Sequence, residues 1–330
     1  MANLRWGILG TARINRRLIP AIRAARRSSL EAVASRDRAR AEAFAREWEI
    51  PQAVEGYQRL LENPSIDAVY IPLPNSEHVK WTLAAIAAGK HVLCEKPLAL
   101  DPAHVDQIAT AARAAKICVE EGFMYRHEPL TARVLELVRS GALGAVRAIV
   151  SGFTYTRTGD NDVRLDPALG GGALWDIGCY PVTYARLIAD RDPKMVFGSA
   201  HWTAGGIDEE FMGLLRFPGG ATATIYAGFI AASRTWLEVL GSDGALTVPN
   251  PFRPGPLETL ELERAGQVER IDVTGSPEIF VREVEHFEAS VLDGAPPVVS
   301  LAESRGTAAS LSALYASARD STSGLRPVSP

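Results

Sequence analysis

The first residues whose spacing could serve chemistry are Gly10-Thr11-Ala12-Arg13-Ile14-Asn15, which lie between an apolar run and an amphipathic run. If these runs form a strand and a helix, the N–H groups at the start of the helix attract a pyrophosphate. Of the dinucleotide-binding pattern G-x-G-x-x-G only Gly10 is present, because Ala12 and Asn15 occupy the other two glycine positions. The turn therefore predicts cofactor contacts at residues 10–14. An ordinary strand-to-helix turn is the alternative.

The next expected strand ends in Ser35-Arg36-Asp37, where dinucleotide-binding folds contact the ribose of the adenosine. An acidic residue there favours NAD, whereas an arginine accommodates the 2′-phosphate of NADP. Ser35 can hydrogen-bond that phosphate, and Arg36 can bind it through two N–H groups. Arg13 or Arg38 can add positive charge from nearby loops. The sequence predicts NADP rather than NAD; alternatively, Asp37 caps the next helix and Arg36 is solvated.

Two further segments are expected at the carboxyl ends of parallel strands, the edge at which open α/β sheets bind ligands. The first is Pro72-Leu73-Pro74-Asn75-Ser76-Glu77-His78, which its prolines keep extended and in which Asn75 and His78 can face the cofactor. Alternatively, Asn75 or Ser76 caps a helix and His78 is solvated. The second is Cys94-Glu95-Lys96-Pro97, whose lysine points to the same crevice. Pro97 keeps the preceding backbone out of the helix, a cis bond being one way to do so.

A parallel sheet is needed to bring these segments to one edge, and the chain up to Gly122 has that pattern. Short apolar runs alternate with amphipathic runs, which predicts βαβ units and a doubly wound sheet, an N-terminal Rossmann domain over residues 1–123. The expected strands are Arg5–Leu9, Leu30–Ala34, Ala68–Ile71, His91–Cys94 and Cys118–Glu121. The expected helices are Ile14–Ala25, Ala39–Trp48, Glu77–Ala88 and Ala103–Ala115.

From residue 124 to 330 the pattern changes and predicts a second α/β domain with an open, mainly antiparallel sheet. The expected strands are Val146–Tyr155, Met195–Trp202, Phe211–Phe217, Ala221–Tyr226, Thr235–Leu240, Leu257–Leu262 and Val268–Val273. The expected helices are Leu130–Arg139, Leu174–Ala189, Ile279–Leu292 and Leu301–Ala318, before a tail from Asp320 that we expect to fray. The last helix is one that can pack back on the first domain.

Composition excludes several classes of protein. The chain has 330 residues, 47% hydrophobic and 22% charged, which is typical of a globular protein of two domains. Its 35 Lys and Arg against 39 Asp and Glu give a net charge of −4, so nucleic acid and membrane are not expected partners. Three scattered cysteines and an N-terminus without a signal-peptide pattern predict a cytoplasmic protein. The six histidines form no short metal-ligand spacing, so we expect no metal. A nucleophilic G-x-S-x-G elbow and a phosphate-binding G-x-x-x-x-G-K-[ST] loop are both absent from the sequence.

Five motifs in order resemble the Gfo/Idh/MocA oxidoreductase family. They are the turn at Gly10, the Pro72–His78 segment, Glu95-Lys96-Pro97, Gly122-Phe123-Met124-Tyr125-Arg126, and the run from Gly170-Gly171-Gly172 to Asp176-Ile177-Gly178-Cys179-Tyr180. The resemblance covers nearly the whole chain and implies a Rossmann domain followed by a domain with an open sheet. It is closer to the glucose–fructose oxidoreductase, xylose dehydrogenase and dihydrodiol dehydrogenase branch, because that branch carries Tyr at position 180 where inositol dehydrogenases carry His.

The resemblance implies that Lys96 and Tyr180 are the catalytic pair. Lowering the pKa of a tyrosine from about 10 to about 7 needs roughly 4 kcal/mol, and one ammonium at about 4 Å supplies about that much at an effective dielectric of about 20. Lys96 would then favour the phenolate of Tyr180, which takes the substrate hydroxyl proton as hydride leaves the same carbon. Asp176 lies four positions before Tyr180, on the same face of an expected helix, and would orient the substrate or the lysine.

Other residues complete the expected site. Cofactor contacts are predicted at Pro72, Leu73, Pro74, Asn75, His78, Glu95, Lys96 and Arg126, in addition to those of the first turn and Ser35-Arg36. Substrate contacts are predicted at Lys96, Tyr125, Arg164, Asp176 and Tyr180. An ion pair at the domain junction is the alternative for Arg126, and a solvated loop is favoured for Asp162.

These features predict an NADP-dependent oxidoreductase acting on a sugar, of aldose type. A trans-dihydrodiol or another carbonyl compound is the alternative substrate, and an NADP-sensing binding protein is the alternative without catalysis. An aromatic stripe of Trp202, Phe211, Phe217 and Tyr226 is typical of sheet packing. Because large open sheets with apolar residues are usually covered, we expect a homodimer or homotetramer formed through the second domain's sheet.

Overall fold

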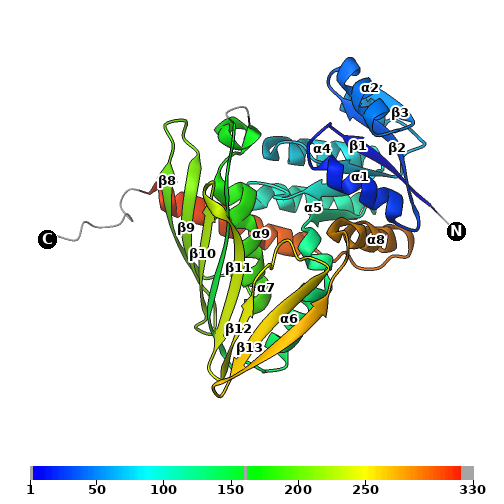
Figure 1. Ribbon diagram of the computed structural model, residues 1–330. Coiled ribbons are helices and arrows are strands. Elements are labelled where there is room, and N and C mark those ends of the chain that lie inside the picture. The colour runs from blue at the N-terminus through cyan, green and yellow to red at the C-terminus, as the bar shows by residue number, and fades with distance from the viewer. Residues whose placement is uncertain (1–2, 160–161, 321–330) are drawn as a thin grey trace. The chain divides into compact units, whose positions relative to one another are not determined.

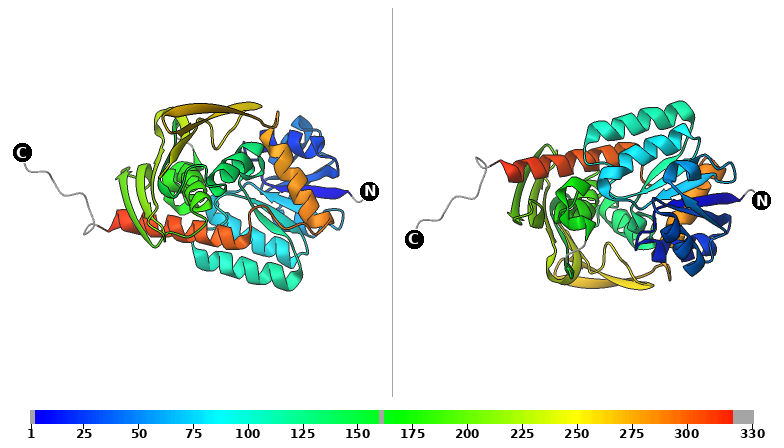
Figure 2. Two further views of the ribbon diagram at one scale, coloured as in Figure 1. Left: turned by 90° about the horizontal axis from the view of Figure 1, so that it is seen from below. Right: turned by 90° about the horizontal axis from the view of Figure 1, so that it is seen from above.

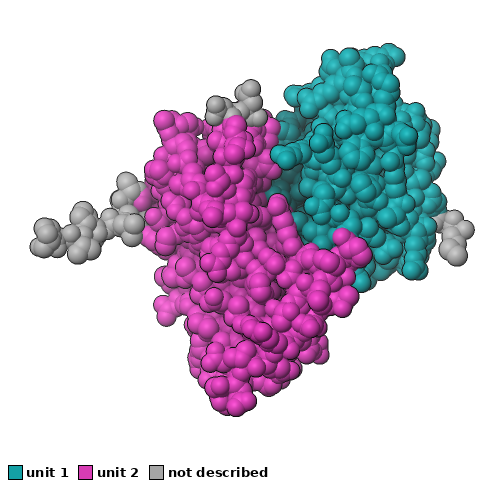
Figure 3. Space-filling model, viewed as in Figure 1, with its two compact units in different colours: residues 1–127, 278–305 teal, residues 128–277, 306–330 magenta. Residues whose placement is uncertain are grey.

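A computed structural model describes residues 3–159 and 162–320 of the chain (Figure 1). Of the tail expected to fray, only Asp320 lies within these ranges. The chain forms two compact units, coloured separately in Figure 3. Unit 1 comprises Met1–His127 with Glu278–Arg305, and unit 2 comprises Glu128–Pro277 with Gly306–Pro330. The division therefore differs from the two consecutive segments expected from the sequence, because a late segment joins the first unit.

Unit 1 is built on a six-stranded parallel sheet of order β3-β2-β1-β4-β5-β6. The order reverses between β1 and β4, which is where such sheets bind ligands at the carboxyl ends of their strands. The Rossmann fold expected from the sequence is confirmed. The short, exposed β3 was not expected, because its residues carry no apolar signal. The strands are β1 (Leu4–Leu9), β2 (Ser28–Ser35), β3 (Gln52–Glu55), β4 (Ala68–Ile71), β5 (His91–Glu95) and β6 (Val119–Gly122).

Helices cover both faces of this sheet. Figure 2 shows α4 and α5 on one face and α1 with α8 on the other. The helix α8 joins unit 1 because its apolar side is buried there, with the ring of Phe287 5.1 Å from that of Trp6 on β1. The helical segments are α1 (Asn15–Ala24), α2 (Arg38–Glu47), α3 (Tyr57–Leu61), α4 (Asn75–Ala87), α5 (Pro102–Ala115), η1 (Met124–His127) and α8 (Ile279–Leu292).

Unit 2 contains an eight-stranded sheet of order β14-β13-β12-β11-β7-β10-β9-β8 (Figure 1). Within the described part of this second sheet, only the β7–β10 pair is parallel, so the mainly antiparallel sheet expected from the sequence is confirmed. The short β12 was not expected. The strands are β7 (Val146–Thr156), β8 (Met195–Trp202), β9 (Asp208–Arg216), β10 (Thr222–Gly228), β11 (Ile230–Gly241), β12 (Gly244–Val248), β13 (Leu257–Arg264) and β14 (Gln267–Thr274).

The helix expected at Leu174–Ala189 is not uniform. Its first turn, η4 (Leu174–Gly178), is a π-helix, and α7 (Cys179–Ala189) continues it as an α-helix. Such π-turns are frequent at functional sites. The other helical segments of unit 2 are α6 (Pro129–Arg139), η2 (Val163–Leu165), η3 (Pro167–Leu169) and the part of α9 (Leu301–Arg319) from Gly306 on.

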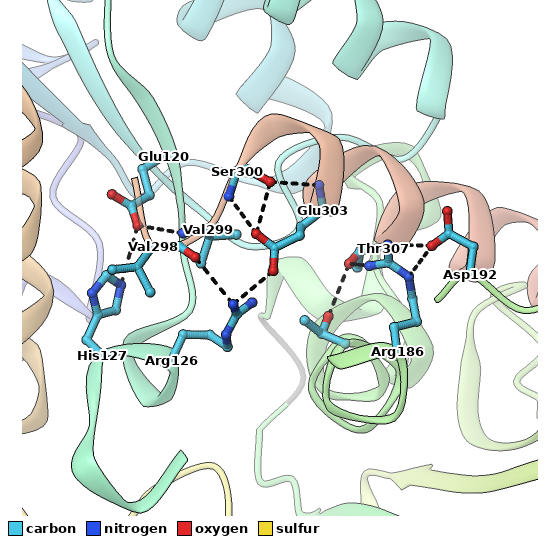
Figure 4. Close-up of polar contacts among 11 residues, drawn as sticks. Glu120, Arg126, His127, Arg186, Asp192, Val298, Val299, Ser300, Glu303 and Thr307 are labelled. Atoms are coloured by element: carbon cyan, nitrogen blue, oxygen red, sulfur yellow. Dashed lines mark hydrogen bonds and ion pairs between the residues drawn. The ribbon is translucent and has the colours of Figure 1, made fainter. Parts of the chain in front are cut away.

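Helices α7 and α9 are tied together by a buried arginine. Arg186 on α7 donates to the hydroxyl of Thr307 on α9 at 2.6 Å and to the carboxylate of Asp192 at 2.6 Å (Figure 4). Gly306 leaves room for this guanidinium, because a Cβ there would lie 1.8 Å from one of its nitrogens. Within the ranges described, no helix is long and apolar enough to cross a bilayer.

Candidate active site

The first turn is closed by a side chain that replaces a missing glycine. Gly10 has φ +109°, and its carbonyl accepts a hydrogen bond from the buried amide of Asn15 at 2.9 Å. Helix α1 begins there without a side-chain cap, and the N–H groups of Asn15, Arg16 and Arg17 donate to the carbonyls of the preceding turn, so an anion would be held by the N–H groups of the turn itself. A Cβ at Gly10 would lie 2.9 Å from Leu73 and 3.8 Å from the hydroxyl of Tyr57. The turn therefore fits a pyrophosphate despite its degraded glycine pattern.

Two arginines lie beside this turn. Arg36 directly follows β2, and Arg40 lies in the first turn of α2. Arg40 donates to the hydroxyl of Thr11 at 2.7 Å. Burial raises the pKa of Tyr57, and both Arg36 and Arg40 oppose that rise. Arg38, in contrast, forms an ion pair with Glu42 on its own helix at 2.8 Å.

Asp37 caps α2, as the alternative interpretation expected. Its carboxylate accepts the backbone N–H of Arg40 at 2.7 Å. Ser35 is buried, and its hydroxyl accepts the N–H of Asp37 at 3.3 Å. This cap fixes the first turn of α2 and with it the place of Arg40, which the sequence analysis missed. Its position three residues after an Asp cap was the available signal. Ser35, Arg36 and Arg40 together suit a 2′-phosphate.

His78 holds the two segments beside the sheet edge together. It is fully buried on α4, with Nε2 2.8 Å from the carbonyl of Leu73 and Nδ1 2.8 Å from the carbonyl of Pro97. Burial lowers its pKa, the two carbonyls oppose this, and the charge of Lys96 lowers it further. Neither Asn75 nor Ser76 caps α4, whose cap residue is Pro74 without a side-chain bond, so that alternative interpretation is wrong.

Lys96 follows β5 directly and is half-buried. The bond from Lys96 to Pro97 is cis, the option that the sequence left open. On the preceding residue, Glu95, the carboxylate accepts a hydrogen bond from the buried hydroxyl of Tyr70 on β4. After the proline, the N–H of Leu98 donates to the buried carboxylate of Glu121 at 2.9 Å. The backbone that carries Lys96 is thus fixed on both sides by side chains of neighbouring strands.

Arg126 has an acidic partner within unit 1. Its guanidinium lies 2.9 Å from the carboxylate of Glu303 and also donates to the carbonyl of Val298 at 3.3 Å (Figure 4). The arginine side chain is only 8% exposed. The alternative interpretation expected an ion pair of Arg126, but it expected one at the domain junction, whereas both partners belong to unit 1. The cofactor contact of Arg126 stays a proposal. Tyr125 is fully buried, with its ring 5.9 Å from that of Phe123.

In unit 2, Asp176 gathers two other side chains. One of its oxygens, Oδ2, accepts hydrogen bonds from Arg164 Nε at 2.7 Å and from the hydroxyl of Tyr155 at 3.1 Å. Asp176 raises the pKa of Arg164, so the guanidinium stays charged. Burial and then Asp176 raise the pKa of Tyr155, so this phenol stays protonated. Asp162 supports Arg164 by accepting its backbone N–H at 3.0 Å. Tyr155 was missed, because it ends a strand whose alternation explains an aromatic residue without a site.

Tyr180 lies at the start of α7 and is 4% exposed. Its ring packs against two phenylalanines that are stacked on each other, with its centroid 5.5 Å from those of both Phe153 and Phe252. The π-turn η4 directly precedes it and carries Asp176. The rigid packing of Tyr180 beside a charged, hydrogen-bonded cluster is suited to proton transfer at a fixed position. Lys96 belongs to unit 1 and Tyr180 to unit 2.

Among the residues that the structure describes, no group of three or more His, Cys, Asp or Glu is arranged to hold a metal ion. A hollow of about 560 Å³ is lined by the loop that contains Arg164, including Asp162, Asp166 and Leu169. The lining contains two carboxylates and no basic side chain.

Two family descriptions match the chain. An oxidoreductase family with an NAD-binding Rossmann fold (GFO_IDH_MocA) matches residues 4–123, and the GFO/IDH/MocA C-terminal domain matches residues 131–247. The chain is 38% identical to a D-xylose 1-dehydrogenase (NADP(+)) of Haloferax volcanii over 96% of this chain and 97% of that protein. It is 37% identical to a dTDP-3,4-didehydro-2,6-dideoxy-alpha-D-glucose 3-reductase of Saccharopolyspora spinosa over 84% of each chain.

A solved structure is also similar over almost the full length. It is KijD10, a 3-ketoreductase from Actinomadura kijaniata in complex with NADP and TDP-benzene, with a TM-score of 0.89 and 32% sequence identity. The match covers 96% of this chain and 98% of that chain.

Proposed function

The chain belongs to the Gfo/Idh/MocA family of oxidoreductases, and on that basis we propose that it is an NADP-dependent enzyme that transfers hydride between nicotinamide and a sugar carbon, of aldose type. The observation that carries the proposal is the Asp176 cluster next to the buried Tyr180 in unit 2. Charged Arg164 and the Tyr155 hydroxyl fix the carboxylate, which can then hold a sugar hydroxyl in place.

The residues of unit 1 support NADP as the cofactor. The backbone of the turn before α1 suits the pyrophosphate, and Ser35, Arg36 and Arg40 suit a 2′-phosphate. The xylose dehydrogenase relative is named for NADP(+), and the similar ketoreductase structure holds NADP. When bound, NADP supplies the acceptor or donor of hydride. The predicted contacts of Pro72, Pro74, Asn75, Glu95 and Arg126 remain part of this proposal.

Tyr180 is the proposed general base and acid. In the oxidative direction its phenolate takes the proton of a substrate hydroxyl group. The carbon that carries this hydroxyl loses its hydrogen as hydride to the nicotinamide and becomes a carbonyl carbon. In the reductive direction Tyr180 donates that proton to the carbonyl oxygen. Lys96 is proposed to stabilise the phenolate by its positive charge. His78 then has a positioning role, because it connects the Pro97 carbonyl to the preceding segment.

The proposal is tested by adding NADP or NAD to the purified protein with a panel of aldoses, inositols and cyclic trans-dihydrodiols, and following cofactor reduction. We expect turnover with an aldose and a preference for NADP. Turnover with a dihydrodiol alone would move the substrate to the alternative branch. Cofactor binding without turnover on any substrate, in either direction, would favour the NADP-sensing protein.

A second candidate is reduction of a keto group on a nucleotide-linked sugar, as the name of the Saccharopolyspora spinosa relative suggests. We rank it second because the xylose dehydrogenase relative matches 96% of this chain at 38% identity and this reductase 84% at 37% identity. A dTDP-linked ketosugar with NADPH is therefore included in the panel, and we expect it to be a poorer substrate than the free aldose.

We further propose that two or more copies associate through the open face of the eight-stranded sheet. Met212 and Leu214 on β9 and Leu240 on β11 are 52%, 45% and 41% exposed. Phe211 of the predicted aromatic stripe is buried, whereas Tyr226 lies opposite Met212 in the sheet register. A second copy would cover these apolar side chains. The cytoplasm stays the proposed location.

A further inference from the structure

An acidic side chain that the proposed mechanism does not use is buried at the start of the site helix. Asp208, the first residue of β9, is 0% exposed. Its Oδ2 accepts the backbone N–H of Leu174, the first residue of η4, at 2.7 Å. A buried carboxylate is unfavourable unless it is hydrogen-bonded, and a helix start is one of the few places that favours its charge. The π-turn η4 otherwise has no side-chain cap.

A local irregularity of the sheet directs Asp208 to this place. Along β9 the residues Phe211, Gly213 and Leu215 are buried and alternate with exposed ones. Continued toward the N-terminus, this alternation would bury residue 209 and expose residue 208. The register between β8 and β9 shifts instead, so that His201 pairs with Glu210 but Trp202 pairs with Asp208. One extra residue on β9 therefore turns Asp208 inward, as bulges beside active sites often do.

The glycine run before η4 is shaped around the same carboxylate. Gly172 has φ +117°, and a Cβ there would lie 2.0 Å from Asp208 Oδ1. At Gly171, a Cβ would lie 2.4 Å from the backbone carbonyl of Arg164. The N–H of Asp176 in turn donates to the carbonyl of Gly172 at 3.1 Å. Asp208 thus contacts the segment from which Asp176 and Tyr180 extend, without being close to the reacting groups in sequence.

We propose that Asp208 is a positioning residue, whose buried carboxyl group holds the start of η4 through its hydrogen bond and so fixes Asp176 and Tyr180 for catalysis. The inference rests on the proposed function for the roles of those two residues. Three features of the structure are explained together by this role. The bulge at β9 turns Asp208 inward, Gly172 leaves room for its carboxylate, and η4 has no cap from its own N-cap residue.

The protonation state of the Asp208 carboxylate should change within the pH range in which the protein can be measured. Burial raises the pKa of Asp208 to about 7, while the N–H groups of Leu174 and Ala173 and the charge of Arg319 on α9 oppose the rise. Opening of η4 would hydrate this carboxylate and return its pKa toward the ordinary value, so ionisation of Asp208 favours the open turn. The start of η4 should therefore be held more tightly as the pH falls from about 8 to about 6.

Amide hydrogen exchange tests the inference without any substrate. In the wild-type protein, exchange of the peptide that spans Gly172 to Tyr180, corrected for the intrinsic effect of pH, should become about 5-fold slower from pH 8 to pH 6. Asp208→Asn cannot ionise and places an NH2 group where a carboxylate oxygen faces backbone N–H groups, so its exchange should be faster than that of the wild type at both pH values and should not depend on pH. The matched control is Glu258→Gln, because Glu258 is also a buried carboxylate of unit 2 that accepts a backbone N–H, that of Gly255 at 2.7 Å.

Kinetics then tests the effect on catalysis. Asp208→Asn should lower kcat about 10- to 100-fold and remove from the kcat profile the fall above about pH 7 that ionisation of Asp208 causes, with the dissociation constant of NADP unchanged within about twofold. Glu258→Gln should change neither quantity.

Two results would overturn the inference. Wild-type exchange at residues 172–180 that does not depend on pH would show that the carboxylate does not hold the turn, whether or not the variant folds. Looser exchange in Asp208→Asn with an unchanged kcat would show that the turn does not serve catalysis. If Tyr180→Phe is fully active in the same assay, the proposed function has failed instead. The exchange data then still decide, independently of activity, whether Asp208 holds the turn.

Discussion

At the scale of single residues, we propose that the preference for NADP depends on the arginines beside the first turn. Arg36 and Arg40 both lie within electrostatic reach of Tyr57, and Arg40 is fixed by Thr11. Removing either one should weaken a contact with the 2′-phosphate, a group that NAD lacks.

We expect Arg36→Ala and Arg40→Ala each to raise the dissociation constant of NADP about 10- to 100-fold, as the loss of a charge-assisted hydrogen bond would, and to leave that of NAD nearly unchanged. Fluorescence titration with both cofactors measures this. Arg38→Ala is the control, because Arg38 is paired with Glu42. Equal losses for both cofactors would contradict the assignment of the 2′-phosphate.

The proposed proton transfer also depends on single residues. Lys96→Ala and Tyr180→Phe should each remove most of the turnover, by about 100-fold or more, and leave NADP binding largely intact. Their effects should not add in the double variant, because the two residues are proposed to act as one unit. Steady-state rates of the three variants, each normalised to the wild type, measure the coupling. Full activity of either single variant would show that the proposed pair is not the catalytic one.

At the scale of elements, a buried carboxylate ties β6 to the chain before α9. Glu120 on β6 is 0% exposed and accepts the N–H of Val299 at 2.9 Å (Figure 4). Burial raises its pKa to about 7, and that of the neighbouring His127 is lowered well below its usual range, first by burial. The histidine is therefore neutral and does not compensate the carboxylate.

The sign of the resulting pH dependence follows from linkage. Because the folded pKa of Glu120 lies above its unfolded value, its contribution is favourable below the unfolded pKa of about 4.3 and is lost as the pH rises through about 7. The shift corresponds to roughly 3 kcal/mol. We expect Glu120→Gln to gain about that much stability relative to the wild type between pH 4.5 and pH 8, as measured by urea unfolding.

Glu303 provides the contrast on the same segment. Burial opposes the charge of this carboxylate, but Arg126 overcomes the opposition and the pKa of Glu303 is lowered. Its contribution is therefore present above the unfolded pKa and is lost as the pH falls. The difference in the free energy of unfolding between Glu303→Gln and the wild type should therefore disappear in acid.

For Glu120, the contrary outcome is that the free energies of unfolding of Glu120→Gln and the wild type change in parallel with pH. That result would show that Glu120 titrates as an exposed group.

At the scale of the whole molecule, the proposed association depends on the open face of the eight-stranded sheet. Met212 and Leu214 point away from the core, since Phe211, Gly213 and Leu215 alternate with them and are buried. On the buried side, Gly213 lies close to Leu314 of α9, so that face is already covered.

We expect the wild-type protein to be a dimer or tetramer and Leu214→Glu to shift it toward monomer, because a buried unpaired carboxylate is strongly unfavourable in an apolar interface. Light scattering coupled to size exclusion measures the mass. Val268→Glu on β14, which is also exposed, is a control at the far edge of the sheet order. A monomeric wild type, or an unchanged mass for Leu214→Glu, would exclude this face as the interface.

The sequence by itself determined the elements and the residue types at their ends. Alternating apolar runs predicted both sheets, because burial of one or both strand faces leaves a direct trace in residue order. The same runs placed Gly10, Arg36 and Lys96 at strand ends. Strands β3 and β12 were not predicted, because short edge or partly exposed segments carry little apolar signal.

Tertiary structure alone decided which side chains meet. Arg40 approaches Thr11 across 29 positions, and Asp208 reaches Leu174 across 34, through a bulge that reverses the strand alternation. The π-turn at η4 and the Arg126–Glu303 pair likewise depend on contacts between segments remote in sequence. Such contacts depend on three-dimensional packing and on local register shifts, neither of which has a period that can be followed along the chain.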